Sequence, residues 1–190
     1  MNFDTDIKQR PSPNFNSRGN IKPIMIVIHW MAGSYQSALN WFMHPEAQVS
    51  PHLAMKGDGS EISQIVDFDK RAWHAGRAAW HPLANGVDIN SCSIGIELEG
   101  PPGVVKTQGW NQALIDLLWQ TCKWIKTKVP TIIGITDHST ILPQPPWCKT
   151  DVLGGTGINT FPWEGVESTG LEDLSIAYIR QQVRDHFKLA

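Results

Sequence analysis

The stretch Ile24-Met25-Ile26-Val27-Ile28-His29 places consecutive apolar residues, most of them β-branched, directly ahead of a histidine. A short run of this kind predicts a strand buried inside a sheet. Similar runs predict further strands over residues 53–56, 62–66, 93–98 and 131–135. The sequence Lys56-Gly57-Asp58-Gly59-Ser60 is typical of a tight turn, so the strands on either side of it should form a hairpin.

Helical periodicity is clearest from Asn111 to Lys126. Its inward-facing residues recur every three or four positions, at Leu114, Leu117, Leu118, Thr121, Cys122 and Ile125. Pro130 should end this helix. Shorter helices are expected over 37–43 and 171–187, the second beginning at Glu172-Asp173. Strands interleaved with such helices predict an α/β fold, a single domain with a mixed central β-sheet flanked by helices.

The first 23 residues differ in composition from the rest of the chain. Pro11, Pro13, Gly19 and Pro23 stand among polar residues, which predicts an extended N-terminal arm over 1–23 that wraps a domain formed by 24–190. The segment 69–92 has little periodicity, and long segments of this kind often bind ligands. We therefore expect the rim of a substrate groove there.

Bulk composition excludes several classes of protein. With 16 Lys+Arg against 18 Asp+Glu, the chain has no basic field for nucleic acid or for an anionic membrane. It has neither a secretory signal nor a run long enough to span a membrane, so we expect a cytoplasmic protein. The 3 cysteines stand at unrelated spacings, which argues against a disulfide framework. The 9 tryptophans suggest a groove for sugar or peptide.

Several polar residues are candidates for chemistry. Asp137-His138 is followed by Cys148-Lys149-Thr150-Asp151 in a proline-rich, non-helical segment. With His29, these residues offer two imidazoles and a carboxylate, a zinc set that leaves one position for water. Each histidine taken alone is better explained as an ordinary hydrogen-bonded residue at a strand end or in a loop, and only the combination favours a metal site.

Two carboxylates interrupt an apolar strand in Ile94-Gly95-Ile96-Glu97-Leu98-Glu99-Gly100. Strand alternation places Glu97 and Glu99 on one face, where burial is costly unless each is paired or used in chemistry. The alternative to a catalytic Glu97 is a buried ion pair with Arg71 or Lys70.

Taken together, these motifs resemble the zinc-dependent N-acetylmuramoyl-L-alanine amidases. The match is closest to the AmpD type of the amidase-2 group, which also contains phage endolysins and peptidoglycan-recognition proteins. It covers about residues 11–163 and rests on Pro11–Asn14, the strand ending at His29, Val49–His52, Asp67–Gly76, Ser93–Gly100, Asp137–Ser139 and Lys149–Asp151.

The resemblance implies hydrolysis of the amide bond between the lactyl group of N-acetylmuramic acid and L-alanine of the peptide stem. His29, His138 and Asp151 would correspond to the ligands of one zinc ion. Glu97 would correspond to the general base, and Lys149 to the cation that stabilises the oxyanion.

Two features depart from the AmpD pattern. The loop from His138 to Asp151 is longer than in that type, and Cys148 is an alternative third ligand because thiolate binds zinc well. We favour Asp151, because the Lys-Thr-Asp register also places Lys149. The segment Ala84–Asn90 lacks the arginine that AmpD-type enzymes use on the anhydro-sugar. Specificity for anhydro-muropeptides is therefore not implied.

The remaining residues of these motifs are assigned to substrate binding. They are His52, Trp73, His74, Asn90 and Trp147. A place behind the metal ligands would also explain His52 and His74, core packing would explain Trp73, and gap filling would explain Trp147. The expected partner is peptidoglycan or its muropeptides, bound by a monomer. A phage endolysin would reach the cell wall through a holin pore. The competing hypothesis is a peptidoglycan-binding protein of the same fold without catalysis.

Overall fold

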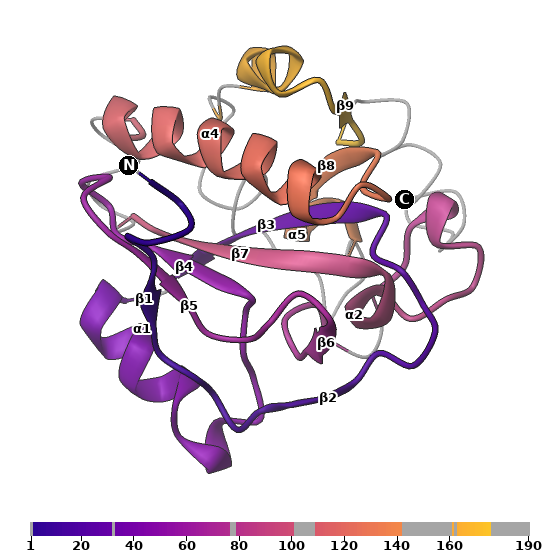
Figure 1. Cartoon of the computed structure of the whole chain (residues 1–190), viewed down its shortest axis with the longest axis horizontal. Coiled ribbons are helices and arrows are strands. Elements are labelled where there is room, and N and C mark those ends of the chain that lie inside the picture. The colour runs from indigo at the N-terminus through magenta and orange to yellow at the C-terminus, as the bar shows by residue number, and fades with distance from the viewer. Residues whose placement is uncertain are drawn as a thin grey trace, which may run out of the picture.

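The computed structural model describes residues 2–31, 33–76, 79–100, 109–141, 161 and 163–175. Its centre is a seven-stranded sheet in the order β1-β5-β4-β7-β3-β8-β9, beside a two-stranded sheet of β2 and β6 (Figure 1). The strands are β1 (Lys8–Gln9), β2 (Phe15–Ser17), β3 (Met25–Met31), β4 (Leu53–Met55), β5 (Ile62–Gln64), β6 (Lys70–Ala72), β7 (Ser93–Glu99), β8 (Gly134–Asp137) and β9 (Glu172–Asp173).

Helices cover both faces of the large sheet. They are α1 (Tyr35–Phe42), α2 (Ile89–Cys92), α4 (Gln112–Lys128) and α5 (His138–Ile141), with the 3-10 helices η1 (Pro45–Ala47), η2 (Pro82–Ala84) and η3 (Trp163–Thr169). The predicted mixed α/β architecture is confirmed. No helix in the described ranges is both long enough and apolar enough to cross a membrane.

Side chains of the central strands alternate between the two faces of the sheet. One face therefore packs against α4, and the other carries the candidate site. Ile26 and Ile28 of β3 pack with the apolar side of α4. Met31, on the opposite face, packs with α1 instead, and Figure 1 shows α4 and α1 on opposite sides of the sheet. His29 has the parity of Met31 and therefore lies on the face away from α4.

The central strands run parallel, which brings their carboxyl ends to one edge. β3 pairs in parallel with both β7 and β8, and β4 pairs in parallel with β7. Only β4 and β5 are antiparallel within the large sheet as described, which confirms the predicted hairpin. In sheets of this kind, ligands bind beyond the carboxyl ends of the strands.

Most predicted elements appear close to their expected bounds. The long helix is confirmed as α4, which Asn111 caps through a hydrogen bond from Ala113 N. The strand expected over 131–135 begins later, at Gly134. After Pro130 the chain makes a turn, in which Ile132 N donates to Val129 O at 3.1 Å. Because of this turn, the ladder with β3 starts only at Gly134.

The start of the predicted C-terminal helix is wrong. Glu172 and Asp173 form β9, which pairs in parallel with β8. Glu172 N donates to Ile133 O at 3.0 Å, and Leu174 N donates to Ile135 O at 2.8 Å. These bonds satisfy the backbone of β8 at what would otherwise be a sheet edge. Leu174 and Ser175 form a turn, and the part of that predicted helix beyond Ser175 lies outside the described residues.

The N-terminal segment is attached at several points. β1 pairs with β5, and β2 pairs with β6. Arg18 is only 4% exposed, and it donates to Asn90 O at 3.0 Å and to Ser91 O at 2.5 Å. Ser12 Oγ donates to Phe42 O at the end of α1. The division into an arm over 1–23 and a domain over 24–190 stays a prediction.

Candidate active site

His29 and Glu97 lie side by side on neighbouring strands. The parallel register of β3 and β7 pairs these two residues directly, so their side chains project from the same face. His29 is 1% exposed, whereas Glu97 is half-buried and lines a pocket. The sheet therefore fixes an imidazole beside a carboxylate at the wall of the pocket.

His138, which directly follows β8, also lies beside His29. Asp137 pairs with Ile28 of β3, and its buried carboxylate accepts from Thr140 N at 2.7 Å and from Ser139 Oγ at 3.0 Å. These bonds hold the turn from β8 into α5. The imidazole of His138 then meets His29, with 2.8 Å between the two Nδ1 atoms.

This pair of nitrogens suits a metal ion. Two nitrogen ligands of a tetrahedral zinc stand about 3.3 Å apart when each bond is about 2.0 Å. The observed 2.8 Å is about 0.5 Å shorter, so a small outward shift of the two rings would fit a metal ion between them. Within the described ranges, no group of three His, Cys, Asp or Glu side chains could hold a metal. The predicted third ligands, Asp151 and Cys148, lie outside those ranges, as do Lys149 and Trp147.

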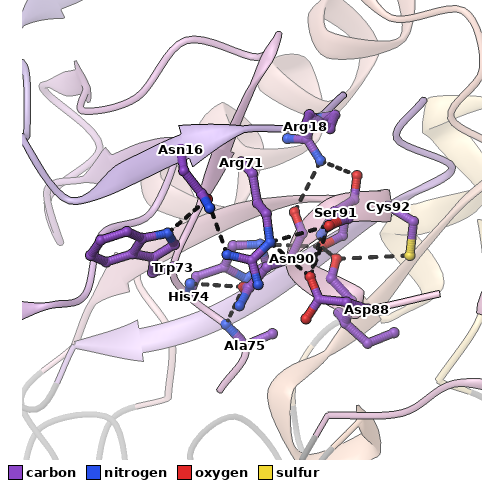
Figure 2. A network of polar contacts seen from close by, with 12 residues as sticks. Asn16, Arg18, Arg71, Trp73, His74, Ala75, Asp88, Asn90, Ser91 and Cys92 are labelled. Atoms are coloured by element: carbon purple, nitrogen blue, oxygen red, sulfur yellow. Dashed lines mark hydrogen bonds and ion pairs between the residues drawn. The ribbon is translucent and has the colours of Figure 1, made fainter. Parts of the chain in front are cut away.

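His74 lies directly behind His29. Its Nδ1 is 2.9 Å from His29 Nε2, and its Nε2 is 3.1 Å from Ser93 Oγ. Asn90 Oδ1 accepts from the backbone N–H groups of His74 and Ala75, as Figure 2 shows. Burial lowers the pKa of His74 well below its usual value, so the ring is neutral. His74 therefore supports His29 and also contributes to the pocket wall.

Gly95 leaves room for the His74 ring. A Cβ atom at residue 95 would lie 2.4 Å from His74 Cγ. Gly95→Ala is therefore expected to lower the free energy of unfolding by about 1–3 kcal/mol, as overpacked cores do. Urea denaturation would measure this. Gly33→Ala is the control, because a Cβ there meets nothing within 4 Å. Equal stability of the two variants would contradict the packing argument.

Two residues assigned to substrate binding do not reach the pocket. His52 is 0% exposed, and its Nδ1 accepts from Gly95 N at 2.9 Å. Burial, with the charge of Arg18 nearby, lowers the pKa of His52 to about 3. Asn90 is buried behind His74 and binds backbone. Both positions fit support of the site better than contact with substrate.

The pocket in front of these residues has a volume of about 510 Å³. Trp41 and Val49, which sequence reasoning did not identify, form an exposed apolar part of its wall. Trp73 is held there by a hydrogen bond from its Nε1 to Asn16 Oδ1 at 3.0 Å (Figure 2). The full lining is Trp30, Met31, Gly33, Ser37, Ala38, Trp41, Phe42, Val49, Ser50, Trp73, His74, Glu97 and His138.

The cations proposed as ion-pair partners of Glu97 bind other carboxylates. Arg71 Nε lies 2.8 Å from Asp88 Oδ2, and Lys70 Nζ lies 2.8 Å from Asp69 Oδ2. The second strand carboxylate, Glu99, accepts from two backbone N–H groups, those of Tyr35 at 2.6 Å and Gly57 at 2.8 Å. Glu99 thus joins α1 to the β4–β5 turn, whereas Glu97 faces the pocket.

The comparisons with known proteins agree with this geometry. The family model Amidase_2, described as N-acetylmuramoyl-L-alanine amidase, matches residues 19–151. The 1,6-anhydro-N-acetylmuramyl-L-alanine amidase AmpD of Enterobacter cloacae is 30% identical over 158 residues, which cover 73% of this chain and 81% of that protein.

Solved structures show the same similarity. A selenomethionine derivative of AmpD matches with a TM-score of 0.66 and 30% identity, over 87% of this chain and 94% of that one. The Escherichia coli amidase AmiD, in complex with the substrate anhydro-N-acetylmuramic acid-L-Ala-D-gamma-Glu-L-Lys, matches with a TM-score of 0.60 and 28% identity, over 82% of this chain and 59% of that one. The sequence resemblance is thereby confirmed: the chain belongs to the Amidase_2 family of N-acetylmuramoyl-L-alanine amidases.

Proposed function

We propose that the protein uses one zinc ion, held by His29, His138 and Asp151, to cut the amide bond between the lactyl group of N-acetylmuramic acid and L-alanine. The observation that carries this proposal is the meeting of two histidine Nδ1 atoms, 2.8 Å apart, beside Glu97 at the wall of a pocket. Two converging imidazoles supply two of the three protein ligands of a hydrolytic zinc site, and the neighbouring carboxylate of Glu97 is placed to act as its general base.

Glu97 and Lys149 carry out the remaining steps of the proposed reaction. A bound zinc ion would supply Lewis-acid polarisation and a more acidic water. Glu97 accepts a proton from the attacking water and later gives one to the departing amine of L-alanine. Lys149 offsets the negative charge on the former carbonyl oxygen. The water oxygen bonds to the carbonyl carbon and the carbon–nitrogen bond breaks, without a covalent bond to the protein.

The third ligand is tested by two single substitutions. Asp151→Ala is expected to lose bound zinc, whereas Cys148→Ala is expected to keep about one zinc ion per chain, because the Lys-Thr-Asp register assigns the carboxylate to the metal. Metal content after dialysis, measured by plasma mass spectrometry, decides between them. The reverse pattern would assign the third position to Cys148.

The substrate is proposed to be peptidoglycan, in its polymeric form as well as in soluble fragments. Support comes from the exposed wall around Trp41 and Trp73, because flat aromatic faces suit sugar rings, and from the missing arginine in Ala84–Asn90. Release of peptide stems from intact sacculi, compared with release from anhydro-muropeptide, tests this point. Activity on the soluble fragment alone would restrict the substrate. The monomeric state and cytoplasmic location stay predictions.

A binding protein without catalysis is the alternative that an activity assay must exclude. Purified protein is incubated with muropeptides, with and without a chelator, and free peptide stems are separated by chromatography. The proposal expects release that the chelator stops and that added zinc restores. Tight muropeptide binding by zinc-loaded protein, with no release, would favour the non-catalytic function.

A further inference from the structure

We infer that Ser93 and His74 act as positioning residues, which fix the tautomer of His29 so that its Nδ1 presents a lone pair to the metal position. This inference rests on the proposed zinc site, and it assigns the ring nitrogens through which Ser93 and His74 act on His29. Its basis is a continuous line of hydrogen bonds from the backbone of α2, through two side chains, to His29.

The direction of this line is set at its far end. Ser93 Oγ lies 2.5 Å from Ile89 O. A carbonyl oxygen can only accept, so the serine donates its single hydrogen to it. Ser93 Oγ must then accept at its other contact, the one with His74 Nε2 at 3.1 Å. The hydrogen of the His74 ring is therefore on Nε2.

The two imidazole rings continue this line of hydrogen bonds. A neutral imidazole has one N–H donor and one acceptor, so His74 Nδ1 is an acceptor. It lies 2.9 Å from His29 Nε2, and that nitrogen must therefore donate. His29 Nδ1 is left with its lone pair directed toward His138 Nδ1. This is the form in which an imidazole binds a metal, with its second nitrogen donating to an outer partner.

The hydrogen-bonded line from Ser93 through His74 to His29 is rigid because all three side chains are buried. Ser93 and His29 are 0% and 1% exposed, and His74 is 8% exposed. Asn90 Oδ1 accepts from the backbone N–H groups of His74 and Ala75. Gly95 has no side chain, so the His74 ring can lie against β7. The other tautomer of His74 would place two acceptors, its bare Nε2 and Ser93 Oγ, in contact, which a buried site does not tolerate.

Ser93→Ala tests the far end of the line. Apo-protein is titrated with zinc against a chromophoric chelator. Loss of the direct outer partner of a ligand typically weakens metal affinity about 10–100-fold. Ser93 acts one hydrogen bond further out, through His74, so we expect a loss at the lower end of that range, about 10-fold. Ser63→Ala is the matched control, because it also removes a fully buried hydroxyl, one that accepts from Tyr35 Oη at 2.8 Å, away from this line. Equal zinc affinity of the two variants would overturn the inference.

Imidazole nitrogen NMR of the metal-free wild type tests the tautomers without any substitution. His29 and His74 should both show a protonated Nε2 and an unprotonated Nδ1. A hydrogen on His29 Nδ1 would refute the inference even if the protein bound zinc tightly. If the wild type bound no zinc but showed the expected tautomers, the proposed metal site would fail while the positioning line stood.

Discussion

Glu97→Gln is expected to lower kcat/KM for muropeptide hydrolysis by about 10²–10⁴-fold, the usual contribution of a general base. The amide has nearly the shape of the carboxylate but cannot accept a proton from water. Because Glu97 is not one of the proposed ligands, zinc content should remain at the wild-type level. Kinetics with soluble muropeptide and metal analysis on the same preparation measure both quantities.

Glu99→Gln is the matched control for this prediction. Glu99 lies two residues further along β7, where its carboxylate accepts from Tyr35 N and Gly57 N. Its substitution should weaken those bonds and reduce stability by about 1–2 kcal/mol, with kcat unchanged. If Glu97→Gln hydrolysed muropeptide at the wild-type rate, the general base would have to be another group.

His29→Ala and His138→Ala are each expected to lose stoichiometric zinc and all measurable hydrolysis. A catalytic site with three protein ligands does not hold zinc well when one is removed. Zinc per chain after dialysis is the measurement. His44→Ala is the control, because that side chain is exposed and lies outside the pocket lining. Full zinc content in His29→Ala would remove His29 from the metal site.

The sequence predicted those parts of the fold that local composition determines. β3 and β7 are mainly apolar runs, and α4 carries a regular apolar stripe, so all three were predicted. β1, β2 and β6 are two or three residues long and exist because a partner strand lies beside them. β9 consists of two acidic residues, whose own preference does not favour a strand. Their structure depends on tertiary pairing, which composition does not reveal.

The residues of the candidate site, like the elements of the fold, were predicted only where the sequence alone carries a signal. His29, Glu97 and His138 interrupt or end apolar strands, which is a visible signal, and the structure brings them together. Sequence reasoning gave no role to Ser93 or Gly95, because their importance depends on the His74 ring that folds onto them. His52 and Asn90 lie in the same motifs but are buried, and a motif alone does not distinguish a groove wall from its support.

Hydrolysis in ¹⁸O-labelled water tests the central claim most directly. Zinc-loaded protein is incubated with a purified muropeptide, and both products are examined by mass spectrometry. We predict one ¹⁸O atom in the lactyl carboxylate of the muramyl product and an unlabelled peptide with a free L-alanine amino terminus. Cleavage at any other bond, or no cleavage by zinc-loaded protein, would contradict the account.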